Sequence, residues 1–249
     1  MDNSKLLDMT ITIGYYMLEY GGEIYRVEES IKRVACAYNA KSVEVFAIPS
    51  SIVVTIVPQQ GTPLTQTKRI YNRVNDLDKI DHLNNLCRNI CSQKPDLEEI
   101  NAKLNAILQR PKYRFQTQVM AFALISFAFT LFFQGTLRDA VVAACIGVII
   151  KLVLYQLERF ESSAFINNIV AGCITATIAV FMVRYHWADN TPIIIIGTLM
   201  NLVPGMALTN SARDFIAGDF IAGLMKMTEA LLIATGIAIG VAIPLSFLF

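Results

Sequence analysis

The chain has 249 residues, of which 54% are hydrophobic and 16% are charged, whereas a typical soluble domain has about 25% charged residues. This composition favours a membrane protein over a wholly soluble one. The formal net charge is +1, and no long basic cluster occurs, so we expect no nucleic-acid partner.

The charged residues divide the chain into two parts. Residues up to Arg114 hold 15 of the 21 Lys and Arg residues and 13 of the 20 Asp and Glu residues. We therefore predict one domain over residues 1–112 and a transmembrane domain over residues 113–249. The predicted fold class is an α-helical polytopic membrane protein with about five transmembrane helices, preceded by a cytoplasmic α+β domain.

The first domain should stay on the side of the membrane where it is made. Its N-terminus lacks the features of a signal peptide. Arg110, Lys112 and Arg114 precede the first apolar stretch, and the positive-inside rule then places this domain in the cytoplasm, with the spans in the inner membrane. Cys87 and Cys91 are four residues apart and could suggest a metal pair, but no second pair accompanies them, so free thiols are favoured. We expect no metal and no cofactor.

Within the first domain, apolar residues recur at helical spacing over residues 6–20 and 23–38, and Gly21 and Gly22 separate these two predicted helices. Stretches rich in β-branched residues predict further elements. The predicted strands cover residues 42–48, 51–57 and 64–71, and two further helices cover residues 77–90 and 97–108. The sequence therefore predicts a helical hairpin, a small sheet and a second helical pair.

No catalytic constellation is found in this domain, so we expect no enzyme and no catalytic residue. Glu28 and Glu29 are adjacent and point in different directions from a helix, which makes a poor acid/base pair. Arg26 is the residue singled out here. With Glu28 nearby, it could couple the domain to the membrane part, or it could form a simple surface ion pair.

Beyond residue 114 the chain is apolar enough to cross a bilayer, whose core of about 30 Å needs roughly 20 apolar residues per helix. Five spans fit this length. They are predicted at residues 115–133, 139–157, 164–183, 192–208 and 220–248.

Residues 197–223, GTLMNLVPGMALTNSARDFIAGDFIAG, form the most informative stretch, here called the signature segment. Asn201 and Pro204 interrupt an apolar run, and Arg213, Asp214 and Asp219 follow. Broken backbone in a membrane is tolerated only where protein or a water-filled cavity receives it. The segment is therefore interpreted as the lining or gate of a polar path. The alternative is a proline-kinked helix that ends in an ordinary charged loop.

Two pairs of residues in the last predicted span also suggest possible roles. Lys226 and Glu229 are three residues apart on one helical face. They form either a self-compensating pair, or a site in which Glu229 carries a proton along the path. Gly236 and Gly240 give a small-residue face that suits close contact between helices.

The run NLVPGMALTNSARDFIAGDFIAGLMKMTEALLIATGIAIG resembles the central signature of the threonine/serine exporter (ThrE-like) family. GGEIYRVEESIKRVA and VEVFAIPSSIVVTI resemble its cytoplasmic N-terminal segment. In that family a cytoplasmic domain precedes about ten spans, in one chain or in two subunits. With five predicted spans, this chain resembles the larger subunit of the split form, the YjjP type. The resemblance implies a hetero-oligomer with a small membrane protein of the same family.

The resemblance further implies proton-coupled export of small hydrophilic metabolites, with threonine and serine as substrates, or a C4-dicarboxylate such as succinate as the alternative. Arg213 could attract the carboxylate that both classes share. Asp214, Asp219 or Glu229 could accept an ammonium group, whereas a dicarboxylate would need a second cation such as Lys226. A second alternative is a membrane-anchored regulatory subunit of a transporter. The positions matching the family signature are Asn201, Pro204, Gly205, Thr209, Asn210, Arg213, Asp214, Gly218 and Asp219.

Overall fold

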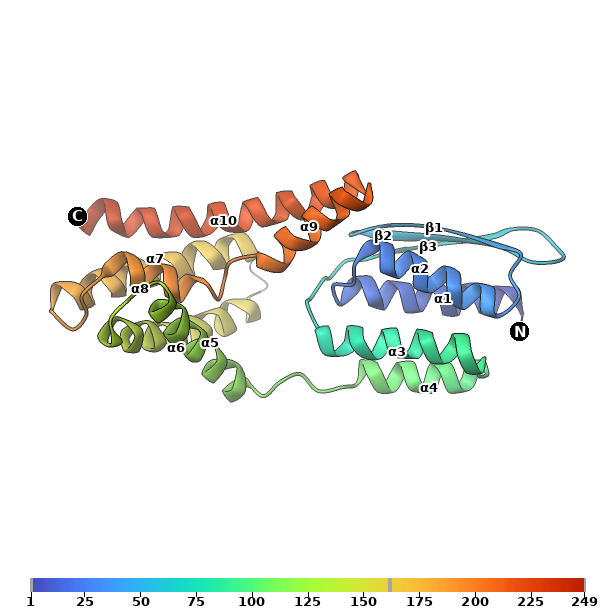
Figure 1. The fold of residues 1–249 in the computed structure, drawn as a ribbon, viewed down its shortest axis with the longest axis horizontal. Coiled ribbons are helices and arrows are strands. Elements are labelled where there is room, and N and C mark those ends of the chain that lie inside the picture. The colour runs from blue at the N-terminus through green and yellow to red at the C-terminus, as the bar shows by residue number, and fades with distance from the viewer. Residues whose placement is uncertain (1, 161–162, 249) are drawn as a thin grey trace. The chain divides into compact units, whose positions relative to one another are not determined.

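The computed structural model describes residues 2–160 and 163–248 (Figure 1). The chain forms two compact units. Unit 1 contains Met1–Pro111 and Thr209–Lys226, and unit 2 contains Lys112–Leu208 and Met227–Phe249. Helices α9 (Gly205–Ala217) and α10 (Phe220–Leu248) each begin in one unit and end in the other. Part of the signature segment therefore belongs to the same unit as the N-terminal domain.

Unit 1 begins with the helical hairpin that the sequence predicts. Helix α1 (Asn3–Glu19) is followed by Gly21, whose φ of +90° lies in the left-handed region, and then by α2 (Ile24–Ala37). The N–H of Gly21 donates to the carbonyl of Leu18, and the N–H of Gly22 donates to that of Met17. These two bonds satisfy the last carbonyls of α1 and end the helix.

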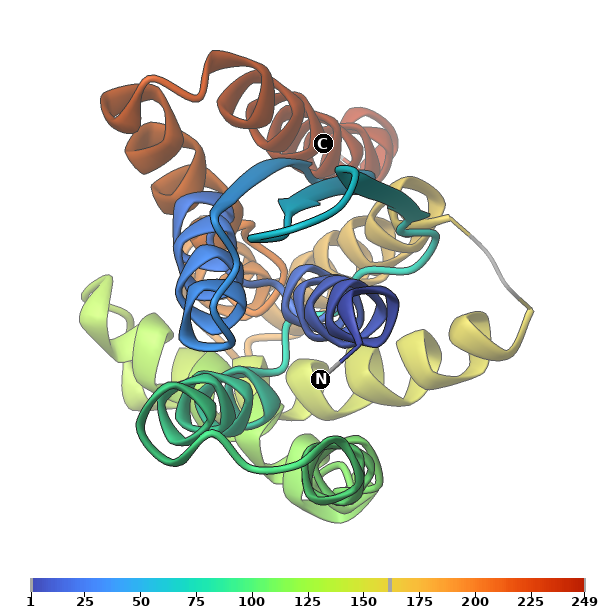
Figure 2. The same ribbon diagram turned by 90° about the vertical axis from the view of Figure 1, so that its right-hand side faces the viewer.

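A three-stranded antiparallel sheet packs against this hairpin. Its strands are β1 (Ser42–Ile48), β2 (Ser51–Val57) and β3 (Leu64–Arg69), in the order β1-β2-β3. Alternate side chains of β1 and β2 are buried, which gives the sheet one apolar face. Helices α1 and α2 lie on one face of the sheet (Figure 2). The three predicted strands are confirmed, although β3 ends two residues earlier than expected.

The predicted second helical pair is also present, as α3 (Leu77–Gln93) and α4 (Leu97–Leu108). Each helix starts at an aspartate whose carboxylate accepts a backbone hydrogen bond from the first turn. Asp76 accepts from the N–H of Lys79 at 3.1 Å, and Asp96 accepts from the N–H of Glu99 at 2.9 Å. Such caps satisfy amide groups that have no partner within the helix.

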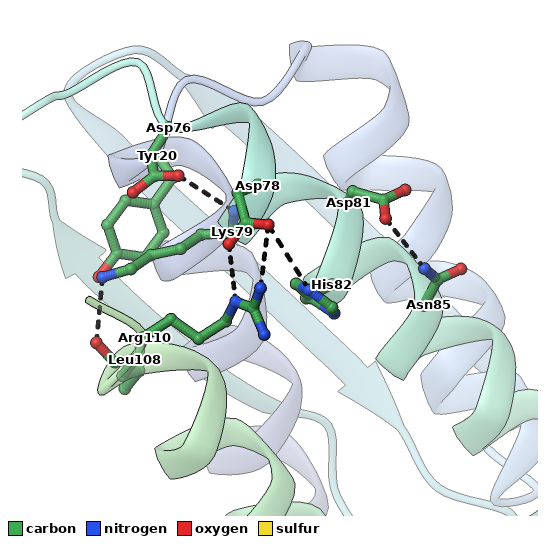
Figure 3. A network of polar contacts seen from close by, with 9 residues as sticks. All are labelled: Tyr20, Asp76, Asp78, Lys79, Asp81, His82, Asn85, Leu108 and Arg110. Carbon is green, nitrogen blue, oxygen red and sulfur yellow. Dashed lines mark hydrogen bonds and ion pairs between the residues drawn. The ribbon is translucent and has the colours of Figure 1, made fainter. Parts of the chain in front are cut away.

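A polar network fixes the C-terminal end of α4, where the chain leaves for unit 2 (Figure 3). The Lys79 ammonium is buried, donates to the carbonyl of Leu108 at 3.0 Å, and lies 4.5 Å from the centroid of the Tyr20 ring. Arg110 makes a two-bonded ion pair with Asp78, at 2.6 and 3.1 Å. The Arg110 hydrogen bond accordingly lowers the pKa of the Asp78 carboxyl below its ordinary value.

The regular elements of unit 2 are all helices within its described residues. Four helices of the described chain are long and apolar enough to cross a membrane, which is consistent with a polytopic membrane protein. They are α5 (Phe115–Phe132), α6 (Leu137–Arg159), α7 (Ala164–Arg184) and α10. Four of the about five expected spans thus correspond to a long apolar helix in the described residues.

The predicted span at residues 192–208 is not one helix. Helix α8 (Thr191–Leu199) has nine residues, so it is about 14 Å long, roughly half of a bilayer core. Turns follow, and α9 begins at Gly205. The physical reason is Pro204, which has no N–H to continue the hydrogen-bond ladder and clashes with the preceding turn.

Small residues allow close helix contact inside unit 2. A Cβ at Gly240 of α10 would lie 2.2 Å from the carbonyl oxygen of Ile169 in α7, and one at Gly236 would lie 3.0 Å from that of Phe165. The predicted role of Gly236 and Gly240 in close packing is confirmed. Helices can approach this far only where no side chain intervenes.

A buried carboxylate at the start of α6 was not singled out by the sequence. Asp139 is fully buried and completes a capping box with Thr136. Its Oδ1 also accepts from the N–H groups of Asp189 and Asn190, at 2.7 and 3.0 Å. The loop before α6 is thereby tied to the loop before α8.

Candidate functional site

The first candidate site is the end of α8, in unit 2. The Asn201 amide Nδ2 donates to the Ser126 hydroxyl at 2.8 Å and to the Phe122 carbonyl at 3.3 Å, both in α5. It also donates to the carbonyl of Thr198 at 3.1 Å. The side chain of Asn201 therefore joins the C-terminal end of α8 to α5.

Two buried oxygens at this end of α8 have no hydrogen-bond partner within the described chain. They are Oδ1 of Asn201 and Oγ1 of Thr198, whose residue is only 1% exposed. A buried polar atom without a partner costs free energy, on the order of 1–3 kcal/mol. Such atoms in a membrane protein mark places where water or a polar solute can bind.

A separate candidate site is the α9–α10 turn, in unit 1. Gly218 has a φ of +90° and ends α9, with its N–H donating to Phe215 and the N–H of Asp219 donating to Asp214. Ser211 of α9 donates to the carbonyl of Gly223 in α10 at 2.9 Å. The two helices are thus held together as a tight hairpin.

A buried ion pair lies inside this hairpin. The Lys226 ammonium is 2.7 Å from Asp214 Oδ2, with only 12% and 1% of the two side chains exposed. The spacing predicts Glu229 as a neighbour of Lys226, but it does not reveal Asp214, which is twelve residues earlier. The two charges compensate each other, and removal of either would leave the other buried without its counter-ion.

A second ion pair joins the hairpin to the N-terminal domain within unit 1. Arg213 Nη1 contacts Oε1 of Glu23, the residue before α2. The other oxygen of Glu23 lies 2.7 Å from Nε of Arg26. The Glu23 carboxylate is therefore shared by two arginines. The sequence singled out Arg26 for coupling, whereas Glu23 makes the contact with the signature segment.

Glu28 also lies close to the signature segment. Its carboxylate accepts a hydrogen bond from the N–H of Ala47 at 2.8 Å. Burial raises the pKa of Glu28 above its ordinary value, the Ala47 bond opposes this, and the nearby charge of Asp219 raises it further. Asp219 lines a shallow pocket of about 320 Å³ between β1 and the α9–α10 turn.

The remaining sequence-predicted positions are spread over the two units. Pro204 and Gly205 lie at the break before α9, and Glu229 is exposed on α10 in unit 2. Thr209 is exposed and Asn210 is half-buried on α9. Unit 1 thus gathers the charged residues Glu23, Arg213, Asp214, Asp219 and Lys226. Asn201, Pro204, Gly205 and Glu229 belong to unit 2.

A sequence model described as "Putative threonine/serine exporter" matches residues 8–248. The chain belongs to the threonine/serine exporter family. The match covers both the N-terminal domain and the apolar helices. No solved structure matches the chain.

Individual members of this family are similar to the chain at low identity. A "Probable threonine/serine exporter" of Mycobacterium tuberculosis is 24% identical over 97% of the chain, but this covers only 46% of that protein. A "Threonine/serine exporter" of Corynebacterium glutamicum is 23% identical over 96% of the chain and 50% of its own length. The chain therefore spans about half the length of these relatives.

Relatives of similar length carry a different name. A "Probable succinate transporter subunit YjjP" of Klebsiella aerogenes is 24% identical over 96% of the chain and 92% of its own length. The corresponding subunit of Escherichia coli is 22% identical, over 96% of the chain and 93% of its own length.

Proposed function

We propose that this protein is a subunit of a membrane transporter that exports small hydrophilic metabolites, with threonine/serine-type amino acids as its substrates and protons as the coupling ion. The observation that carries the proposal is the family match over residues 8–248. In this proposal residues 1–112 form a cytoplasmic domain. A small membrane protein of the same family supplies the remaining spans.

The broken segment after α8 supports the assignment to transport. Discontinuous helices in transporters expose backbone and polar side chains at the substrate site. Asn201 and Thr198 provide buried oxygens that an ammonium group could occupy. Separately, in unit 1, Arg213 offers a guanidinium group to a carboxylate. In this proposal Asp219 and Glu229 are the carboxylates that carry protons.

A second candidate substrate is a C4-dicarboxylate. The observation that favours it is length, since the two succinate transporter subunits align over more than nine-tenths of both chains. Such a substrate requires two cationic groups, and Lys226 would have to leave Asp214 to act as the second. Export of threonine requires no such exchange of partners.

The deciding experiment measures efflux from cells preloaded with labelled threonine, serine or succinate. It compares this chain, its small partner and both together. Export that requires both chains supports the two-subunit proposal, and the compound that leaves fastest identifies the substrate class. If this chain alone exports, the partner proposal is wrong. If no arrangement exports any of the three compounds despite verified expression, the transport proposal is wrong.

The same assay separates a transporter from a regulatory subunit. Replacement of Asp219 by asparagine should abolish efflux if the chain forms the path. A regulatory subunit should keep its effect after this replacement, and its N-terminal domain should retain that effect on an unrelated membrane anchor.

A further inference from the structure

The facing sides of α2 and α3 form an open pocket of about 700 Å³ in unit 1, here called the α2–α3 pocket. Its lining residues on α2 recur at i, i+3, i+4 and i+7, and those on α3 follow the same spacing. Each helix therefore contributes one continuous face. Its principal polar lining residues are Arg26, Ser30 and Arg33 on α2 and Asn84, Arg88 and Ser92 on α3.

The lining of this pocket carries an excess of positive charge. Three arginines face it, and Glu29 is its only acidic residue among those that the structure describes. Glu29 pairs with Arg33 at 2.5 Å. Arg88 has no acidic partner among the described residues, and its polar contact is a 3.4 Å hydrogen bond to Asn85. At least one guanidinium group is thus available to a ligand.

The apolar wall of the pocket is formed by neutral thiols. Burial raises the pKa of Cys87 to about 12. Burial also raises the pKa of Cys91, although Arg33 opposes this effect. Both thiols therefore stay protonated at neutral pH and do not compete with an anion for the arginines. Protonated thiols are also poor nucleophiles, which favours a binding site over a catalytic one.

We propose that the α2–α3 pocket binds a small multivalent oxyanion, whose carboxylate or phosphate oxygens accept hydrogen bonds from Arg26, Arg33 and Arg88. Guanidinium groups bind such oxygens in pairs with matching planar geometry. Hydroxyl and amide groups from Ser30, Ser92 and Asn84 are placed to complete the recognition of an oxygen-rich ligand.

Binding of an anion in this pocket would change the ion pairing of the signature segment. Arg26 is shared between the pocket and Glu23, and Glu23 in turn pairs with Arg213. An anion that draws Arg26 away leaves the Glu23 carboxylate to Arg213 alone, which strengthens that pair. The pocket is therefore a regulatory site. This second step rests on the proposed transport function, whereas the binding step does not.

Binding is tested by calorimetric titration of the purified full chain in phosphatidylcholine nanodiscs, with pyrophosphate and citrate as probes. Arg88→Gln and Arg33→Gln should each weaken binding about tenfold or more, because each removes a charged hydrogen-bond donor to the anion. Lys103→Gln is the matched control, because Lys103 forms an exposed ion pair on α4, outside the pocket. The Lys103→Gln variant should bind both probes with the same affinity as the wild type.

Failure of both probes to bind, or equal losses in all three variants, would overturn the site. A second set of nanodiscs contains anionic lipid. If the probes bind with unchanged affinity in the nanodiscs that contain anionic lipid, this result supports a soluble ligand. Competition by the lipid supports the same site with a headgroup phosphate as its occupant.

Coupling is tested separately with Glu23→Gln in proteoliposomes that hold pyrophosphate on the side of the N-terminal domain. This variant should keep pyrophosphate binding but lose the effect of pyrophosphate on the export rate. Pyrophosphate that binds the wild type without changing its export rate would overturn the coupling alone. If the wild type exports nothing, the transport proposal fails while the calorimetric result for the pocket still stands.

Discussion

Asp214 and Lys226 form an ion pair of 2.7 Å between α9 and α10, with almost no exposure to solvent. Asp214→Asn would leave the Lys226 ammonium buried without its counter-ion. We expect this variant to lose about 3–5 kcal/mol of unfolding free energy, as is typical when one partner of a buried pair is removed. Thermal unfolding of the purified protein in detergent, followed by circular dichroism, measures the loss.

A double variant serves as the control for that prediction. Asp214→Leu combined with Lys226→Met replaces both charges by apolar groups, and such replacements of buried pairs are often neutral or stabilising. The double variant should therefore unfold close to the wild-type temperature. If the stability loss of the double variant equals the sum of the losses of the two single variants, the two side chains act independently.

Gly197 permits the contact between α8 and α5. A Cβ at this position would lie 2.1 Å from Thr130 Oγ1 and 2.8 Å from the Thr130 backbone. Gly197→Ala should therefore force the helices apart and cost about 1–3 kcal/mol, the usual range for overpacking. Gly205→Ala is the matched control, because a Cβ there meets nothing within 4 Å. The control should leave the unfolding temperature unchanged or slightly raised, and equal losses in both variants would contradict the close-contact explanation.

Lys79 holds the end of α4 through its contacts with Leu108 and the Tyr20 ring. Lys79→Met would keep the aliphatic stem but leave the Leu108 carbonyl without this donor, at a cost of about 1–3 kcal/mol. Backbone amides near residue 108 should then exchange with deuterium faster than in the wild type. Lys103→Met, at an exposed ion pair, should change stability by only about 0.2–1 kcal/mol. Unchanged exchange in Lys79→Met would refute the role of Lys79.

Glu28 makes stability depend on pH in a defined direction. Because its pKa is raised in the folded protein, the native state binds a proton more readily than the unfolded chain. The contribution of Glu28 to the unfolding free energy is therefore largest below the pKa that Glu28 has in the unfolded chain. This contribution is lost as the pH rises through the pKa of Glu28 in the folded protein. Glu28→Gln removes this titration and should gain stability relative to the wild type as the pH rises. Parallel pH profiles of unfolding temperature for the two proteins would contradict this.

Local sequence signals predicted the regular elements of this fold well. The Gly21–Gly22 pair, the helical spacing of apolar residues and the β-branched residues of the strands act through neighbours in the chain, so the sequence alone reveals them. The division of residues 192–208 was foreseen as a break at Pro204, yet the short length of α8 was not. Hydropathy cannot distinguish a half-length apolar helix from a full span, because both are composed of the same residues.

The candidate site was only partly predictable. The charged positions of the signature segment stand out in the sequence because they interrupt apolar runs. The contact of Glu23 with Arg213 joins residues that are far apart in the chain, and no periodicity signals it. The Asp214–Lys226 pair depends on how tightly the α9–α10 hairpin closes, and so on Ser211 and Gly223.

The shortness of α8 has a consequence for how the chain threads the bilayer. With nine residues, α8 can cross only about half of the hydrocarbon core. A chain that crosses the bilayer at residues 191–208 would therefore continue through the turns at residues 200–204. A crossing of this kind places irregular backbone inside the hydrocarbon layer, where its amide and carbonyl groups can be satisfied only by protein, water or a passing solute.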